Sequence, residues 1–365
     1  MDELFYRIAW TQIPGFGHGI LRQLIRTFGS GKEAWHASFS DLKGVEGLGE
    51  RLVYLLKNHR KLAFEQSEQQ VQLILKHNIH WLLWGESGFP DRLKQCIDSP
   101  AFLLYKGQLD WQSKRWVAVV GTRKATEQGR ISTREIVKVL AEYNAVVVSG
   151  LAYGIDICAH REALDCGIPT LAILGSGLNR IYPSEHSFEA KRILENGAVA
   201  TEFMPNEGPD REHFPMRNRI IAGISDAVVV VEAGNQGGAW ITARLANDYN
   251  RDVFAVPGPW NKPYSLGCNQ LISSHLAAIL TQARDIPKLL SWNNTAPEPT
   301  VRQLQLFPAE TQNVADILIR ENKPVFFDDL LQKSGYSASE LQVLLFKMEM
   351  EGCIKNLPGR FIQLC

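Results

Sequence analysis

The chain has no net charge and no long hydrophobic run. Its 365 residues include 39 Lys plus Arg and 39 Asp plus Glu, so its composition gives no general attraction to nucleic acid or to an anionic membrane. Any site for a polyanion must therefore be a local cluster of basic residues. No run approaches the roughly 20 apolar residues that a membrane span needs. The acidic N-terminus, MDELFYRIAW, does not resemble a signal peptide.

The six cysteines form neither a CxxC pair nor a metal-binding pattern. Cys158 and Cys166 lie among apolar residues, which is typical of buried thiols. We therefore expect no disulfide framework, and this favours a reducing cytoplasm. His160, His186 and His213 lie in separate predicted elements, so no metal site is expected.

Complete nucleotide-binding motifs are also missing. Residues 175–177 read Gly-Ser-Gly, but position 180 is Arg where a GxGxxG motif has its third glycine. No GxxxxGK[ST] sequence occurs. These absences argue against a dinucleotide or nucleoside-triphosphate site, and we expect no cofactor.

The length exceeds one ordinary core, so two or three domains are expected. From residue 116 onward, short β-branched runs alternate with helical segments. Continuously apolar strands with helical crossovers predict a parallel sheet covered on both faces, which is a Rossmann-like, doubly wound α/β fold. The predicted strands are 79–84, 116–120, 145–149, 170–174, 198–200, 227–232 and 252–256.

Residues 1–75 are predicted to be helical. They contain two Gly-x-Gly turns, in IPGFGHGILRQLI (13–25) and VEGLGERLVYLL (45–56). This is the outline of paired helix-hairpin-helix units, whose backbone amides hold DNA phosphates without sequence preference. A helical bundle with glycine turns explains the pattern equally well, so both interpretations stay open.

The C-terminal part contains a polar, proline-rich segment and then three predicted helices. These helices are followed by two short strands around Pro358-Gly359, which is a winged-helix outline. The third helix, 337–351, has Lys347 as its one basic residue besides three glutamates, so a protein contact or a structural role is favoured over base reading. The expected domains are a helical, helix-hairpin-helix or SAM-like domain (1–75), an extended Rossmann-like domain (76–284), a linker (285–309) and a winged-helix-like domain (310–365).

Glycine-rich segments follow the strands of the predicted sheet. Because the carboxyl ends of parallel strands meet at one edge, we expect these segments to form one amide-lined groove there. Arg123, Arg217 and Arg219 would give the groove positive charge. Amide dipoles and guanidinium groups both match phosphate oxygens, and an extended single strand of nucleic acid suits such a groove. The segments are 117–130, 149–160, 174–183, 213–246 and 256–272.

Several of these residues also have a structural explanation. His160 is best explained as a packed helix residue. Asp156 is either a first-turn acid that favours the helix dipole or a chemical group. Phe214 either stacks on a base or anchors its loop. Arg217 and Arg219 flank Asn218, and this pattern favours a binding function over a pair of structural salt bridges.

The same segments resemble the DNA-processing protein A (DprA/Smf) family over roughly residues 89–280. Three positions depart from the usual family pattern: Tyr153 replaces an arginine, Gly238 replaces a serine and Cys268 replaces a threonine. The motifs that carry the resemblance are VGTR (120–123), SGLAYGID (149–156), GIPTLAILGSGLNRIYP (167–183), FPMRNRIIAG (214–223), GGAWITA (237–243), VPG (256–258) and GCN (267–269).

The resemblance implies a protein that is not an enzyme. Family members bind and protect single-stranded DNA during natural transformation, load the recombinase RecA onto it, and form homodimers through the Rossmann-like domain. Carried over by position, the DNA-binding residues are Arg123, Ser149, Gly150, Phe214, Arg217, Asn218 and Arg219, with Gly175, Ser176 and Gly177 as further groove-lining positions.

A small-molecule enzyme is the alternative. The segment EAGNQGGAWIT (232–242) faintly resembles the PGGxGTxxE turn of nucleoside-monophosphate phosphoribohydrolases. The catalytic acid of that turn is missing, because the position four residues after Thr242 is Ala246.

Overall fold

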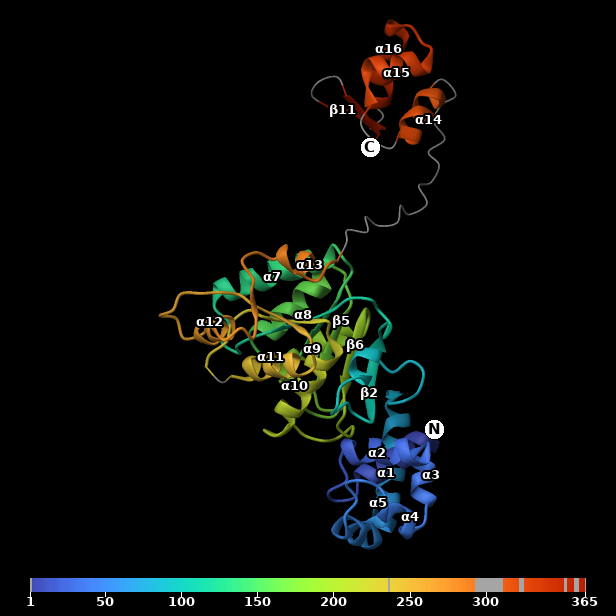
Figure 1. Ribbon diagram of the computed structural model, residues 1–365, viewed down its shortest axis with the longest axis vertical. Coiled ribbons are helices and arrows are strands. Elements are labelled where there is room, and N and C mark those ends of the chain that lie inside the picture. The colour runs from blue at the N-terminus through green and yellow to red at the C-terminus, as the bar shows by residue number, and fades with distance from the viewer. Residues whose placement is uncertain are drawn as a thin grey trace. The chain divides into compact units, whose positions relative to one another are not determined.

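The computed structural model describes residues 2–235, 237–292, 311–321, 325–350, 353–357 and 361–364. The chain divides into two compact units, Met1–Asn293 and Asn294–Cys365 (Figure 1). The larger unit contains the predicted α/β sheet and the N-terminal helices, and the smaller unit contains the predicted winged helix.

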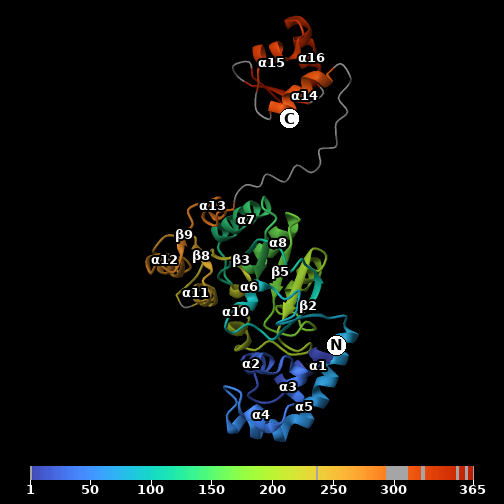
Figure 2. The ribbon, with the colours of Figure 1, turned by 45° about the vertical axis from the view of Figure 1, so that its right-hand side comes forward.

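The larger unit is built on a nine-stranded sheet with the order β1-β2-β6-β5-β4-β3-β7-β8-β9. The neighbouring pairs from β6 to β9 are parallel, whereas β2 pairs antiparallel with both β1 and β6. Figure 2 shows the strands running across the unit from β2 to β9. The strands are β1 (His80–Leu83), β2 (Phe102–Gln108), β3 (Trp116–Val120), β4 (Val146–Ser149), β5 (Thr170–Ile173), β6 (Gly197–Thr201), β7 (Ala227–Val230), β8 (Asp252–Ala255) and β9 (Ala278–Ile279).

The chain reverses its direction of travel across the sheet beside β3. It passes from β3 through β4 and β5 to β6 on one side, and then returns to β7, β8 and β9 on the other. This order confirms the predicted doubly wound, Rossmann-like fold. It also places the topological switch point, where such folds bind ligands, between β3 and β7.

Helices cover both faces of the sheet, because alternate residues of the central strands point in opposite directions. Val117 and Val119 belong to the core shared with α7 (Glu127–Ala141), α8 (Ile155–Asp165) and α13 (Asp285–Leu289). Ala118 and Val120 belong to the core that includes α10 (His213–Ile224), α11 (Gly238–Asp248) and α12 (Leu266–Ser273). A short 3-10 helix, Ser184–His186, leads into α9 (Ser187–Ile193) beside β5 and β6.

Several elements were not predicted from the sequence. They are the strands β2 and β9 and the helices α6 (Asp91–Lys94), α10 and α13. Helix α13 occupies the start of the predicted linker, and its Ile286 is fully buried in the core of the larger unit. The predicted linker residues from 293 to 309 lie outside the described residues.

The N-terminal region is helical, as predicted. Its two glycine turns have the same geometry: Gly15 and Gly47 have positive φ angles of 85° and 87°, and Gly17 and Gly49 precede α2 and α5 as extended N-cap residues. Each turn thus joins two helices through a glycine with positive φ. The helices are α1 (Asp2–Thr11), α2 (His18–Phe28), α3 (Gly31–His36), α4 (Phe39–Lys43) and α5 (Glu50–Lys76).

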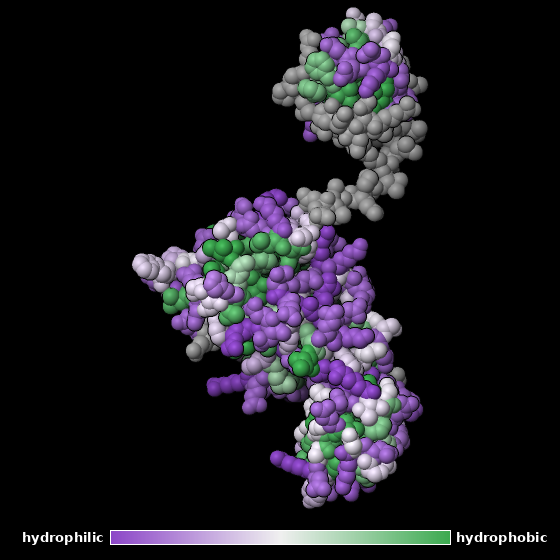
Figure 3. All heavy atoms as spheres, in the orientation of Figure 1, coloured by the Kyte–Doolittle hydropathy of each residue, from purple (hydrophilic) through white to green (hydrophobic). Residues whose placement is uncertain are grey.

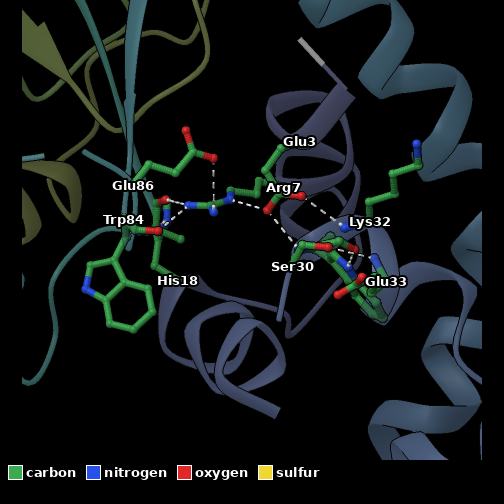
Figure 4. A network of polar contacts seen from close by, with 11 residues as sticks. Glu3, Arg7, His18, Ser30, Lys32, Glu33, Trp84 and Glu86 are labelled. Atoms are coloured by element: carbon green, nitrogen blue, oxygen red, sulfur yellow. Dashed lines mark hydrogen bonds and ion pairs between the residues drawn. The ribbon is translucent and has the colours of Figure 1, made fainter. Parts of the chain in front are cut away.

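These helices are fastened to the edge of the sheet by a buried arginine of α1 (Figure 4). Arg7 is 3% exposed and donates hydrogen bonds of 2.8 Å to the carbonyls of Trp84 and Ala101. Its Nε also donates to Glu3 at 2.6 Å. The apolar side chains of the helices and of the sheet form one continuous core, so the helices do not fold around a separate core of their own.

The smaller unit has the predicted winged-helix order. It consists of α14 (Gln312–Glu321), β10 (Val325–Phe326), α15 (Phe327–Ser334), α16 (Ala338–Met350), β11 (Ile354–Leu357) and β12 (Phe361–Leu364), with the sheet order β10-β12-β11. Ser337 and Glu340 form a capping box at the start of α16, since each side chain accepts from the other's backbone N–H, at 2.9 and 3.4 Å. The predicted Pro358-Gly359 turn lies outside the described residues.

Replacing the buried arginine tests how the helices are attached. We expect Arg7→Met to lower the free energy of unfolding by about 2 to 4 kcal/mol, because it leaves two buried carbonyls without donors. Urea denaturation followed by tryptophan fluorescence measures this loss. The exposed Arg51 of α5 provides the control, and Arg51→Met should change stability by less than about 0.5 kcal/mol. Equal stability of the two variants would contradict the attachment.

Candidate nucleic-acid interface

A cleft of about 410 Å³ lies at the predicted switch point. Its walls come from the loop after β3, the start of α8, helix α10, the loop after β7 and the start of α11, and Tyr264 also lines it. A narrower hollow adjoins it and reaches Tyr153 and Tyr182. The cleft and the hollow share Arg123, Ala152, Phe214 and Arg217, so they form one continuous surface, which we call the switch-point groove.

The groove combines a free positive charge with an aromatic floor. Arg123 is exposed, and its guanidinium lies 5.1 Å from the centre of the Phe214 ring. The ring of Tyr182 lies beside Phe214, at 5.8 Å between ring centres and tilted by 46°. Arg123 and Lys124 have no carboxylate within 4.0 Å in the described part of the chain. Both cations are therefore available to an anionic ligand.

A second arginine lies beneath the floor of the groove. Arg217 is 5% exposed, and its Nη1 donates to the carbonyls of Gly150 and Ile173 at 2.5 and 2.6 Å. Burial lowers the pKa of Arg217 to about 10, Asp156 opposes this shift and Arg123 adds to it. Arg217 therefore stays charged at neutral pH, and it ties together the ends of β4 and β5.

Asp156 holds the loop after β4. Its carboxylate accepts from the backbone N–H of Gly150 at 3.1 Å. Burial raises the pKa of Asp156, whereas Arg217 and the backbone amides of Gly150 and Ala152 act in the opposite direction. Of the two roles that the sequence left open, the geometry fits the structural one.

His160 is a packed residue, as expected. It is fully buried and lies 2.7 Å from the hydroxyl of Thr170. Burial lowers its pKa to about 3.

The loop after β4 needs glycine because it passes very close to the loop after β3. Gly154 has a φ of 80°, and a Cβ there would lie 2.1 Å from the carbonyl oxygen of Thr122. A Cβ on Gly150 would lie 2.1 Å from Nη1 of Arg217. Both glycines of SGLAYGID thus allow the close packing that shapes the groove.

Six predicted site residues meet at the groove. Arg123, Phe214 and Arg217 line both parts of it. Asn218 is in the wall of the cleft and donates to the carbonyl of Gly238 at 3.4 Å. Gly150 and Gly175 line the hollow.

Three further predicted positions are engaged within the fold, although one of them, Ser176, also lines the hollow. Ser149 is fully buried, and its hydroxyl donates to the carbonyl of Val119 at 2.7 Å. Gly177 is buried against the backbone of Met204. Ser176 lines the hollow but is 2% exposed, and its hydroxyl donates to the carbonyl of Arg180. The prediction that Ser149 and Gly177 contact DNA is therefore not supported by their positions, because Ser149 is fully buried and Gly177 is buried.

Arg219 lies outside the groove, which also corrects the prediction. Successive residues of a helix are about 100° apart, so Arg217 and Arg219 of α10 point in opposite directions. Arg219 forms an ion pair with Glu202 and donates to the carbonyl of Asp98. Nε2 of His18, from α2, lies 3.2 Å from the same carboxylate. Arg219 is thus part of the contact between the sheet and the N-terminal helices.

Burial in this cluster shifts the pKa values of both Glu202 and His18. Burial raises the pKa of Glu202 to about 7 against the pull of Arg219. Burial, together with Arg219 and Arg22, lowers the pKa of His18 to about 3. His18 is therefore neutral at physiological pH, and Arg219 is the cation that balances Glu202.

The sequence did not reveal the role of Glu232, whose carboxylate lies where Rossmann-like folds usually bind a phosphate. Rossmann-like proteins hold phosphates at the N-terminus of the helix after the first strand. Here, the carboxylate of Glu232 accepts from the backbone N–H and the hydroxyl of Thr126, at 3.0 and 2.5 Å, and Thr126 caps α7. A nucleotide phosphate would meet a carboxylate there. Glu232 is also the acidic residue that begins segment 232–242, which resembles the phosphoribohydrolase turn. These hydrogen bonds therefore engage its carboxylate.

None of the helices of the described residues is long and apolar enough to cross a membrane. Within the same residues, no group of three His, Cys, Asp or Glu side chains is arranged to hold a metal ion.

Removing Arg219 should destabilise the protein in a pH-dependent way. The raised pKa of Glu202 means that the folded state binds a proton more tightly than the unfolded state, so this group costs stability as pH rises from about 4.5 to 7. Arg219→Met raises that pKa further, and the cost then keeps growing above pH 7. We expect a loss of about 3 to 5 kcal/mol at pH 8 and less at pH 6. Urea denaturation at both pH values measures it, and Arg123→Met is the exposed control. A loss that does not depend on pH would contradict this assignment.

Comparisons with known proteins agree with this geometry. The family model described as DNA recombination-mediator protein A matches residues 80–291, and the DprA winged helix domain matches residues 284–360. Protein Smf of Escherichia coli is 34% identical over 343 residues, which cover 90% of this chain and 90% of that protein. DNA processing protein DprA of Streptococcus pneumoniae is 41% identical over 198 residues, which cover 54% of this chain and 70% of that protein.

Two solved structures share the fold. DNA processing protein A from Streptococcus pneumoniae superimposes with a TM-score of 0.69 and 31% identity, covering 78% of this chain and 97% of that one. The structure that describes the single-stranded DNA binding mode of DNA processing protein A from Helicobacter pylori has a TM-score of 0.53 and 28% identity, covering 58% and 95%. The sheet order, the switch-point groove, the winged helix and these matches together place the chain in the DNA recombination-mediator protein A (DprA/Smf) family.

Proposed function

We propose that the chain binds single-stranded DNA in the switch-point groove and acts as a mediator of recombination during natural transformation. The observation that carries the proposal is the unpaired Arg123 stacked on Phe214 at the edge of a cleft. A guanidinium with no protein carboxylate matches a phosphate oxygen. The aromatic floor offers a surface for an unpaired base.

The groove suits a single strand better than a duplex. Phe214 and Tyr182 present ring faces that a base can stack on only when it has left its pairing partner. The structure that describes single-stranded DNA binding by the Helicobacter pylori relative supports the same ligand class. Stacking on aromatic rings tolerates any base, so we expect little sequence preference.

The groove favours binding over chemistry. Asp156 is the carboxylate in its lining, and it is 6% exposed and engaged with the amide of Gly150. A general base needs a free oxygen within reach of the substrate. We therefore infer a protein without enzymatic activity.

The winged helix is not assigned to base reading in this proposal. Helix α16, at the position of a recognition helix, exposes Val343, Phe346 and Met350 by 67%, 64% and 74%. These apolar side chains, three and four residues apart, lie on one face of the helix. They are unsuited to a phosphate backbone, which agrees with the predicted protein-contact role.

We further propose that the protein forms a homodimer and delivers its DNA to the recombinase RecA. Strand β9 ends the sheet, and its two residues are exposed. Ile279 of this strand is apolar and 48% exposed, and Figure 3 shows apolar surface gathered on the larger unit. An uncovered edge with an exposed apolar residue is suited to pairing with another chain.

The thiols of Cys96 and Cys268 are buried and unbridged, which fits a reducing cytoplasm.

Removing the two free cations of the groove tests the proposal. We expect Arg123→Ala combined with Lys124→Ala to lower the affinity for a single-stranded oligonucleotide by about 10- to 100-fold, because two phosphate contacts are lost. The slope of log affinity against log salt should become shallower by about 1.4. Fluorescence anisotropy at several salt concentrations measures both quantities.

The control removes the same charge elsewhere. Lys61→Ala combined with Lys76→Ala changes two exposed lysines of α5, and it should leave the affinity and the salt slope unchanged. A duplex of the same sequence should compete poorly with the single strand. Equal binding by both double variants would show that the strand lies elsewhere.

A further inference from the structure

The most exposed aromatic side chain of the described residues lies on a loop beside the groove. Trp260 is 86% exposed, and it is in the loop of residues 256–265 between β8 and α12. Figure 1 shows this loop projecting from the larger unit next to α12. No ring contact or cation–π contact involves Trp260 in the described structure. A large aromatic surface held in water is typical of a contact site.

The loop is braced, so the tryptophan is held outward by the backbone. The side chain of Asn269 bonds both backbone groups of Gly258, at 3.2 and 2.8 Å. The N–H of Lys262 donates to the carbonyl of Pro259, and the carbonyl of Tyr264 accepts from Ala233. Three prolines, at positions 257, 259 and 263, further restrict the chain. A ligand that contacts Trp260 therefore meets a preformed surface and loses little conformational entropy to it.

The position of the loop connects it to the groove. Strand β8 is parallel to β7 and β3, so the loop that follows it leaves from the edge of the sheet where the groove lies. Tyr264 lines the cleft, and Trp260 is four residues away, at most about 14 Å of extended chain. A stacked single strand rises about 3.4 Å per nucleotide. Trp260 is thus within about four nucleotides of the cleft.

The chemistry of the loop suits a nucleic acid. Its sequence, VPGPWNKPYS, contains no acidic residue. The ammonium group of Lys262 is exposed, and no carboxylate of the described chain lies within 4.0 Å of it. An indole face beside a free cation provides both parts of a single-strand contact, one for a base and one for a phosphate.

We propose that Trp260 is a base-stacking platform that extends the switch-point groove along β8. The strand that leaves the cleft past Tyr264 stacks a base on the indole of Trp260, and Lys262 binds the neighbouring phosphate. This proposal rests on the proposed function, since it requires a single strand in the groove. The loops after β5, β4, β3 and β7 span three strand spacings, or about 14 Å, so an oligonucleotide of about four nucleotides fills the groove without Trp260 and a 20-mer reaches it.

The test compares oligothymidylates of these two lengths. We expect Trp260→Ala to weaken binding of the 20-mer by about 5- to 150-fold, the usual effect of removing one stacking aromatic, and to leave binding of the tetramer unchanged. Trp260→Phe keeps a ring and should bind the 20-mer within about threefold of the wild type. A 20-mer of abasic residues should bind the wild type and Trp260→Ala equally. Phe346→Ala removes a ring of α16 that is 64% exposed, and it serves as the control.

The outcomes separate the two proposals. If the wild type binds both oligonucleotides but Trp260→Ala binds the 20-mer equally well, the platform is overturned and the groove assignment stands. If Trp260→Ala keeps its affinity but changes the sedimentation coefficient of the protein, the platform is likewise overturned and Trp260 is a contact between proteins. If the wild type binds neither oligonucleotide, the proposed function fails and the platform fails with it.

Discussion

The groove depends on the buried guanidinium of Arg217. The parallel strands β4 and β5 end side by side, and their last carbonyls would repel each other if nothing lay between them. Nη1 of Arg217 donates to the carbonyls of Gly150 and Ile173, which sets the spacing of the loops that follow. Burying this cation is costly, and Asp156 and the carbonyl oxygens offset the cost. The same charge makes the floor of the groove attractive to an anion.

Helix α10 joins the groove to the N-terminal helices, because one of its faces lines the groove and the other contacts Glu202 beside α2. Phe214, Arg217 and Asn218 face the groove, whereas Arg219 holds Glu202 at the contact with α2. The helix is packed over most of its length, since its residues from Ile220 to Ile224 are all buried. A displacement of the side chains on one face of α10 therefore moves the whole packed helix. The N-terminal helices and the groove are connected through this helix.

The sequence predicted the parallel strands because their signal is local: runs such as Trp116–Val120 are apolar throughout and are buried throughout. Helix α10 was missed because its motif, with Pro215 near its start and little apolar contrast between its faces, has the appearance of a loop. That error led to placing Arg217 and Arg219 together, although a helix separates them. The burial of the Ser149 hydroxyl was also beyond a sequence argument, because it depends on a neighbouring strand 30 residues away.

The groove differs from a nucleotide site in the positions of its charged side chains: a carboxylate lies where a phosphate would bind, and the cations lie at the rim. Glu232 fills the phosphate position at the start of α7, so the fold's usual anchor for a small ligand is closed. The free cations, Arg123 and Lys124, lie outside this position, at the rim of the cleft. The aromatic rings of Phe214, Tyr182 and Tyr264 come from three different segments of the chain. A mononucleotide would reach only part of this surface. A polymer with a regular spacing of charges and bases reaches all of it, and the arrangement therefore selects for chain length over base identity.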